Sequence, residues 1–121
     1  MKRIVLVVVA AVAAVSALPA SGGRDAFSFV QVTEKEFTLT LSRQGVRAGS
    51  VSVEVVNFGM DNHDLVIKGV KIGSKPIRFK QLDPRGQAER TLRLTPGRYA
   101  LWCSLADHKA RGMKATLVVR R

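Results

Sequence analysis

Four side chains in this sequence could together hold a soft metal ion: His63, Cys103, His108 and Met113. His108 follows Cys103 by five positions, Met113 follows His108 by five, and His63 comes from a distant segment. Two imidazoles, a thiolate and a thioether suit copper that cycles between Cu(I) and Cu(II), with the Met as a weak axial ligand. Zinc accepts imidazole and thiolate, but a thioether is an unusual fourth ligand for zinc. The joint order and spacing of the four residues therefore predict one copper ion.

Short alternating segments on both sides of these residues predict the strands that must position them. A period of two with β-branched enrichment is typical of half-buried strands. These segments are 27–32, 36–41, 51–55, 65–67, 91–94, 99–103 and 115–119. Residues 76–81 are the one candidate for a short helix. Regular spacing and Gly- and Pro-containing turns predict an all-β fold, an antiparallel Greek-key β-sandwich or barrel of about eight strands.

The N-terminus has the pattern of a secretory signal peptide over residues 1–20. Lys2 and Arg3 precede an apolar run over 4–17, and small residues follow at Ala17 and Ala20. A short membrane anchor is the alternative, but the run is shorter than the ~20 residues of a span, so cleavage is favoured. We expect a flexible segment at 21–26, a copper-binding domain at 27–121, and export to the periplasm, the cell envelope or the outside of the cell.

Composition narrows the class of protein further. Hydrophobic residues make up 46% and charged residues 24% of the chain, which excludes wholesale disorder. The single Cys excludes an intramolecular disulfide and any site that needs two thiolates. Unpaired thiols tend to be oxidised in exported proteins, so Cys103 should be either buried or occupied by a metal.

Two stretches of the sequence resemble the cupredoxins, the small blue copper proteins. The resemblance spans roughly 27–119 and rests on two motifs. The first combines Pro96, Gly97, Tyr99, Cys103, Ser104, His108, Gly112 and Met113, and the second combines Asn57, Gly59, His63 and Leu65. Two features differ from many members of the family: four residues separate Cys103 from His108, and Asp64 replaces the more common Asn after the first His.

The resemblance implies a cupredoxin-like sandwich with one type 1 copper ion at His63, Cys103, His108 and Met113. Together with the signal-like N-terminus, it implies an exported carrier of single electrons. A copper storage or delivery protein of the cell envelope is the alternative, and a metal-free cupredoxin-like interaction module is a third class, against which the intact ligand set argues. Four protein ligands leave no open position for a substrate, so we do not expect an enzyme. Asp64 can accept a hydrogen bond from the Ser104 hydroxyl and so replace the more common Asn; a solvent-facing residue at a strand edge is the alternative. By resemblance, His108 is partly exposed in an apolar patch, for which the candidates are Met60, Leu105, Ala106 and Ala110.

Charge gives expectations about partners. The chain carries +11, and loss of residues 1–20 leaves eighteen basic against nine acidic residues. Lys109, Arg111 and Lys114 flank His108, so we expect a redox partner with an acidic docking face. Weak attraction to anionic membrane surfaces is a second expectation. Scattered basic residues and 6% aromatic content argue against nucleic acid as a partner. We expect a monomer, with Trp102 as a second electron route or as ordinary packing on the outer sheet face.

Overall fold

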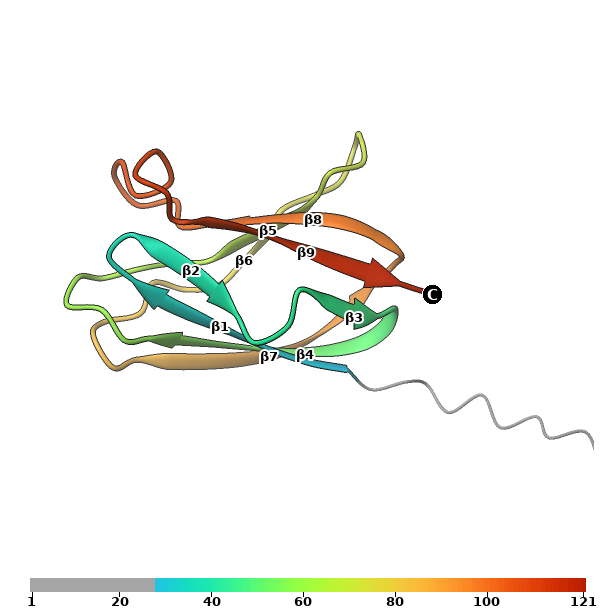
Figure 1. Cartoon of the computed structure of the whole chain (residues 1–121), viewed down its shortest axis with the longest axis horizontal. Coiled ribbons are helices and arrows are strands. Elements are labelled where there is room, and N and C mark those ends of the chain that lie inside the picture. The colour runs from blue at the N-terminus through green and yellow to red at the C-terminus, as the bar shows by residue number, and fades with distance from the viewer. Residues whose placement is uncertain (1–27) are drawn as a thin grey trace, which may run out of the picture.

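The computed structural model describes residues 28–121, which form two β-sheets packed face to face (Figure 1). The predicted signal peptide at 1–20 and the predicted segment at 21–26 lie outside the described residues. No helix in the described part of the chain has the length and apolar character needed to cross a membrane. The strands of residues 28–121 are β1 (Ser28–Lys35), β2 (Thr38–Leu41), β3 (Gly45–Arg47), β4 (Gly49–Asn57), β5 (Val66–Gly69), β6 (Ile77–Arg78), β7 (Gln87–Leu94), β8 (Gly97–Trp102) and β9 (Lys114–Arg120).

The strands are ordered β2-β1-β4-β7 in one sheet and β3-β9-β8-β5-β6 in the other. The predicted all-β sandwich is confirmed, but the prediction of purely antiparallel pairing is wrong. β1 pairs with β4 in parallel, and β3 pairs with β9 in parallel. The reason is a change of sheet: after the β1–β2 hairpin the chain crosses to the second sheet as β3, so that β4 enters the first sheet from the same end as β1.

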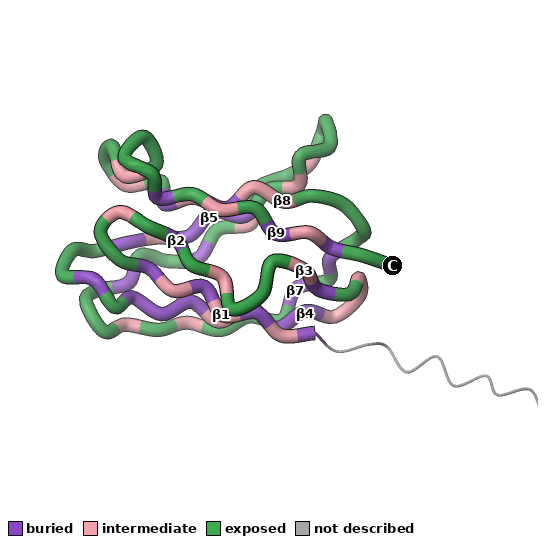
Figure 2. The backbone as a smooth tube through the Cα atoms, in the orientation of Figure 1, coloured by how far each residue is buried: buried purple, intermediate pink, exposed green. Residues whose placement is uncertain are grey.

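The core lies between the sheets and follows the alternation seen in the sequence. On β1 the buried positions are Ser28, Val30, Val32 and Glu34, and the residues between them are half-buried. Figure 2 shows buried positions along the strands of both sheets and mainly exposed positions in the loops. Burial of Val, Leu and Ile side chains at these inward positions contributes roughly 1.5–3 kcal/mol each. Glu34 carries the one carboxyl group among the buried side chains of residues 28–121.

The predicted short helix at 76–81 is wrong. Residues Ile77–Arg78 form β6, which pairs antiparallel with β5. Phe79 is buried, and its N–H donates to the carbonyl of Leu65 at 2.9 Å. Pairing with β5 satisfies the backbone and buries Phe79, which outweighs the weak helical preference of so short a segment.

Two loops at one end of the sandwich matter for function. One connects β4 to β5 and contains His63; the other connects β8 to β9 and contains residues 103–113. Both loops lie at the left end in Figure 1. We call this end the metal-site pole and the opposite end the distal pole.

Candidate metal centre

Three of the four predicted ligands converge at the metal-site pole. One ligand atom each from His63, Cys103 and His108 lies within 4.8 Å of the other two. His63 Nδ1 is 3.3 Å from His108 Nδ1, and Cys103 Sγ is 3.5 Å from the same His108 nitrogen. A compact group of two imidazole nitrogens and one sulfur is a donor set that fits a copper ion.

His63 is held by backbone pairing as well as by side-chain contacts. Its N–H donates to the carbonyl of Leu82 at 3.1 Å, and its carbonyl accepts the N–H of Leu82 at 2.7 Å. The imidazole is fully buried. This small antiparallel bridge fixes His63 directly before β5, so its side chain enters the cluster from a segment that is itself anchored.

Met113 ends the loop that contains Cys103 and His108. It directly precedes β9 and is fully buried. Its carbonyl accepts the N–H of Cys103 at 3.1 Å, and its own N–H donates to the carbonyl of His108 at 3.0 Å. Gly112 adopts a φ of 113°, a region that favours glycine, and so allows the sharp return. Cys103 and Met113 therefore form the two sides of a narrow neck.

The Cys103 sulfur has a buried and partly polar environment. Burial raises the pKa of the Cys103 thiol, although hydrogen bonding from backbone N–H groups, that of Asp64 first, acts in the opposite direction. The Asp64 N–H points at the sulfur from 3.5 Å. A metal that binds here must therefore displace a firmly held proton.

Asp64 joins the two loops, as predicted. Its Oδ1 accepts the backbone N–H of Ser104 at 2.6 Å, and its Oδ2 accepts the Ser104 hydroxyl at 2.5 Å. The predicted hydrogen bond to Ser104 is thus confirmed, and a second one accompanies it. Two charge-assisted bonds across the site keep His63 and Cys103 at a fixed separation.

Glu36 is a contact that the sequence reasoning missed. Its Oε1 accepts the N–H groups of Met60 and Asp61, each at 2.7 Å, and lies 3.0 Å from His63 Nε2. Backbone hydrogen bonding, from Asp61 first, lowers the pKa of Glu36 to about 2. An ionised carboxylate only accepts hydrogen bonds, so Nε2 of His63 must carry the proton. Nδ1 is then free to face the cluster.

The loop between β4 and β5 contains a glycine that makes room for Glu36. A Cβ added at Gly59 would collide with the Glu36 carboxylate. Gly59 N–H also donates to the Asn57 side chain at 2.8 Å, which tightens the turn after β4. Asn57 and Gly59 therefore allow the backbone of the β4–β5 loop to approach the Glu36 carboxylate closely.

His108 is partly exposed at the metal-site pole. The Phe37 ring packs edge-on against it with centroids 4.9 Å apart, and the Arg111 guanidinium carbon lies 3.5 Å from the Phe37 ring centroid. Of the predicted patch residues, Met60, Ala106 and Ala110 are exposed, and Leu105 packs against the core. The exposed Phe58 was not among the predicted candidates.

Glu34 is a second buried acid that the sequence reasoning missed. Its side chain is fully buried, and neither carboxyl oxygen has a hydrogen-bond partner within residues 28–121. Burial, with a smaller contribution from the negative charge of Asp64, raises the pKa of Glu34 to about 8. Glu34 pairs across strands with Leu39 and Asn57. With a pKa of about 8, its carboxyl group is mostly protonated at neutral pH.

Comparison with known proteins identifies the fold of this chain. By sequence, no family model and no curated protein matches the chain. A dithionite-reduced auracyanin from Roseiflexus castenholzii superposes with a TM-score of 0.63 at 19% identity, over 78% of this chain and 98% of its own. Auracyanin A from Chloroflexus aurantiacus, a blue copper protein, gives 0.61 at 14% identity over 78% and 100%. A purple cupredoxin from Nitrosopumilus maritimus gives 0.50 at 18% identity over 77% and 99%. This chain has the cupredoxin fold.

Within this cupredoxin fold, the His63, Cys103 and His108 cluster is compatible with a type 1 copper site. Three of the four predicted donors come together, one from the β4–β5 loop, which joins the two sheets, and two from the β8–β9 loop of the second sheet. Glu36 and Phe37, which reach the cluster from the β1–β2 connection, were found only from the structure. In the sequence, Gly59 was the one feature indicating that another group lies close to the β4–β5 loop; that group is the Glu36 carboxylate.

Proposed function

We propose that this chain binds one copper ion through His63, Cys103, His108 and Met113 and carries single electrons between partner proteins outside the cytoplasm. The observation that carries the proposal is the approach of one donor atom each from His63, Cys103 and His108 to within 4.8 Å of the other two. A bound copper ion supplies a one-electron Cu(I)/Cu(II) couple at that position.

The surrounding residues are suited to holding the donors still. Asp64 joins the two loops through Ser104, Glu36 fixes the tautomer of His63, and the neck between Cys103 and Met113 closes the loop. Electron transfer is fast when the ligands move little between the two oxidation states. Loading releases the Cys103 proton, so binding of copper should strengthen as pH rises.

The exposed edge of His108 is the proposed route for the electron. Lys109 and Arg111 lie on the same loop and Lys114 begins β9 directly after it; all three favour a partner with acidic groups near the contact. Asp61 and Asp107 lie at the same pole, so the excess positive charge is limited to the surroundings of these three side chains and does not extend over the whole pole. Trp102 is covered by Lys109, whose Nζ lies 4.3 Å from the ring centroid, and this supports His108 rather than Trp102 as the route.

We favour a carrier over an enzyme because of the ligand count. The same fold also occurs in a multicopper oxidase, so the fold alone does not decide between the two classes. Three strong donors and a buried thioether leave no open coordination position for a substrate, unlike catalytic metal sites.

The test is to add Cu(II) to the chain and record visible absorption and electron paramagnetic resonance. We expect an intense thiolate charge-transfer band and a narrow copper hyperfine splitting. Cys103→Ser should abolish the band. An uncoloured wild type, or a variant that keeps the colour, would refute the ligand assignment.

A second measurement separates a carrier from a copper-delivery protein. The loaded protein is reduced and mixed with a competing Cu(I) chelator. A carrier should keep its copper and undergo rapid electron exchange with a small redox mediator. Fast loss of Cu(I) to the chelator with slow electron exchange would favour delivery instead.

A further inference from the structure

The charges of this protein are unevenly distributed between its two poles. Four segments meet at the distal pole: 42–49, 69–75, 93–98 and 118–121. These segments contain no Asp or Glu. Their basic side chains are all exposed, and none lies within ion-pair distance of a carboxylate in residues 28–121. They are Arg43, Arg47, Lys71, Lys75, Arg93, Arg98, Arg120 and Arg121.

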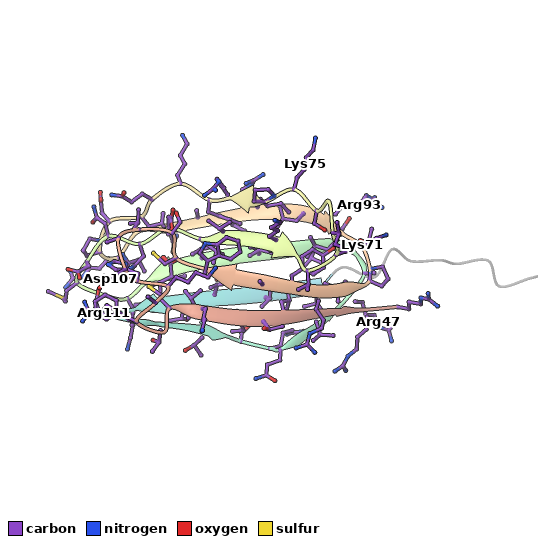
Figure 3. All side chains as sticks on the ribbon, turned by 90° about the horizontal axis from the view of Figure 1, so that it is seen from above. Arg47, Lys71, Lys75, Arg93, Asp107 and Arg111 are labelled. Atoms are coloured by element: carbon purple, nitrogen blue, oxygen red, sulfur yellow. The ribbon has the colours of Figure 1, made fainter. Side chains whose placement is uncertain are left out.

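The metal-site pole has a much smaller net charge. Segments 34–37, 58–64, 78–86 and 102–114 contain seven basic and six acidic side chains, and one of the acidic ones is the buried, mostly protonated Glu34. Figure 3 shows Arg47, Lys71, Lys75 and Arg93 toward one end of the molecule and Asp107 and Arg111 toward the other. Within residues 28–121, the positive charge is therefore concentrated at the end farthest from Cys103.

An apolar tip projects from the same basic pole. The loop between β5 and β6 extends beyond the sheet at the upper right of Figure 1. Ile72 at its tip is 99% exposed and Val70 is 64% exposed, with Lys71 between them and Lys75 after them. Gly73, at a φ of 84°, and a hydrogen bond from Ser74 N–H to the Lys71 carbonyl at 3.1 Å shape the turn. Apolar side chains flanked by lysines match the acyl-headgroup boundary of a bilayer.

Four of the arginines are also grouped. Arg43, Arg47, Arg120 and Arg121 line one open cleft together with Ser28. Guanidinium groups bind phosphate oxygens in a bidentate manner, so such a group suits lipid phosphates. Ser28, the first residue that the structure describes, begins β1 at this pole.

We propose that the distal pole is a docking surface for an anionic lipid membrane. The eight basic side chains contact the headgroups, and Ile72 and Val70 insert into the boundary below them. In this orientation the metal-site pole points away from the bilayer. Docking itself does not depend on the metal; only the consequence, that His108 faces partners in the aqueous phase, rests on the proposed function.

The test uses metal-free protein comprising residues 21–121, which contains both complete sheets. Sedimentation with phosphatidylcholine vesicles, with and without phosphatidylglycerol, measures binding. We expect binding only to the anionic vesicles, with an affinity that falls as salt rises. Each basic side chain near an anionic surface contributes roughly fivefold in affinity, so Lys71→Glu with Lys75→Glu should weaken binding by at least roughly 25-fold.

The matched control carries the same change in net charge at the other pole. Lys35 and Lys80 are exposed lysines of the metal-site pole, and Lys35→Glu with Lys80→Glu should weaken binding by less than roughly fivefold. Ile72→Ser should weaken binding severalfold and leave the unfolding midpoint unchanged, because the side chain is solvent-exposed.

Three outcomes would overturn the proposal. The first is no binding to anionic vesicles at low salt, and the second is equal loss of binding in the two double variants. The third is binding to an acidic polypeptide as tight as binding to vesicles and indifferent to Ile72→Ser, which would point to a protein partner. None of these readouts involves copper, so failure here leaves the proposed function standing, and failure of the copper spectrum leaves the docking surface standing.

Discussion

Replacement of Glu34 by Gln should remove a loss of stability that the wild type suffers as pH rises. The Glu34 carboxyl group is fully buried without a hydrogen-bond partner in residues 28–121, and its pKa is raised to about 8 from the usual 4.5. Below pH 4.5 the group is protonated in both the folded and the unfolded chain, so it causes no pH dependence there. Between the two pKa values, the unfolded chain releases the proton and the folded chain keeps it.

The magnitude follows from that difference in bound protons. When the folded state holds one more proton, the free energy of unfolding falls by about 1.4 kcal/mol per pH unit. From pH 4.5 to about 8 the accumulated loss has an upper bound of about 5 kcal/mol. A small domain is stabilised by only about 5–15 kcal/mol in total, so the effect should be easily measurable.

Urea unfolding of the metal-free protein at a series of pH values from 4 to 9 provides the assay. Other titrating groups are common to wild type and variant, so the difference between the two curves isolates Glu34. The stability of Glu34→Gln relative to wild type should grow steadily across the window and then level off near pH 8. Glu34→Leu should give the same slope with a further gain at every pH, because it also removes an unpaired polar group. Parallel curves for wild type and Glu34→Gln would refute the reasoning.

Three further predictions concern the metal centre. Met113→Leu should keep copper bound and raise the reduction potential, with stability of the metal-free protein changed by less than about 1.5 kcal/mol; loss of copper in a dialysis assay would contradict this. Glu36→Gln should raise the potential measured by voltammetry and shift the tautomer of His63 in nitrogen NMR of the metal-free protein, and an unchanged spectrum would exclude the positioning role. Asp64→Asn should lower the free energy of unfolding by less than roughly 1 kcal/mol, because the amide oxygen still accepts the Ser104 N–H and the amide NH2 can donate to the Ser104 hydroxyl, so that only the charge of the acceptor is lost; Ser104→Ala removes one of the two hydrogen bonds and should cost roughly 0.5–1.5 kcal/mol, and urea unfolding measures both.

The donor residues could be predicted because their chemistry is local to the sequence. Cys103, His108 and Met113 lie within one short stretch, and the alternation of β8 and β9 on either side predicts a loop at the end of a sheet. The alternation of apolar and polar residues in the sequence, with a period of two, also predicted most of the strands. The combination of two His, one Cys and one Met was informative because a thioether ligand favours copper over most other metals.

The residues around the donors could not be predicted in the same way. Glu36 meets His63 across 27 positions, and that contact depends on the path of two loops rather than on any periodic pattern. Glu34 occupies an inward position of β1 where the alternation predicts an apolar side chain. The parallel pairing of β1 with β4 depends on which sheet β3 joins, and a single strand pattern does not encode that choice.

The distribution of charge was hidden for a related reason. Net charge does not say where the charged side chains lie, so the sequence alone indicated only that Lys109, Arg111 and Lys114 flank His108 and that the other basic residues are scattered. The fold brings four separate segments together at the distal pole, and only that arrangement reveals that these segments of residues 28–121 form an end without acidic side chains.

The neck between Cys103 and Met113 has a consequence for how this protein can evolve. β8 and β9 remain in register up to the pair Trp102 and Lys114, directly beside the neck. An insertion or deletion within residues 104–112 would therefore change the spacing of the donors without shifting either strand. Selection can vary the properties of the centre through one short stretch of the gene while the sandwich is inherited unchanged. The loop behaves as a separable unit of variation, and exchanging it between relatives should alter the metal site while leaving the two sheets intact.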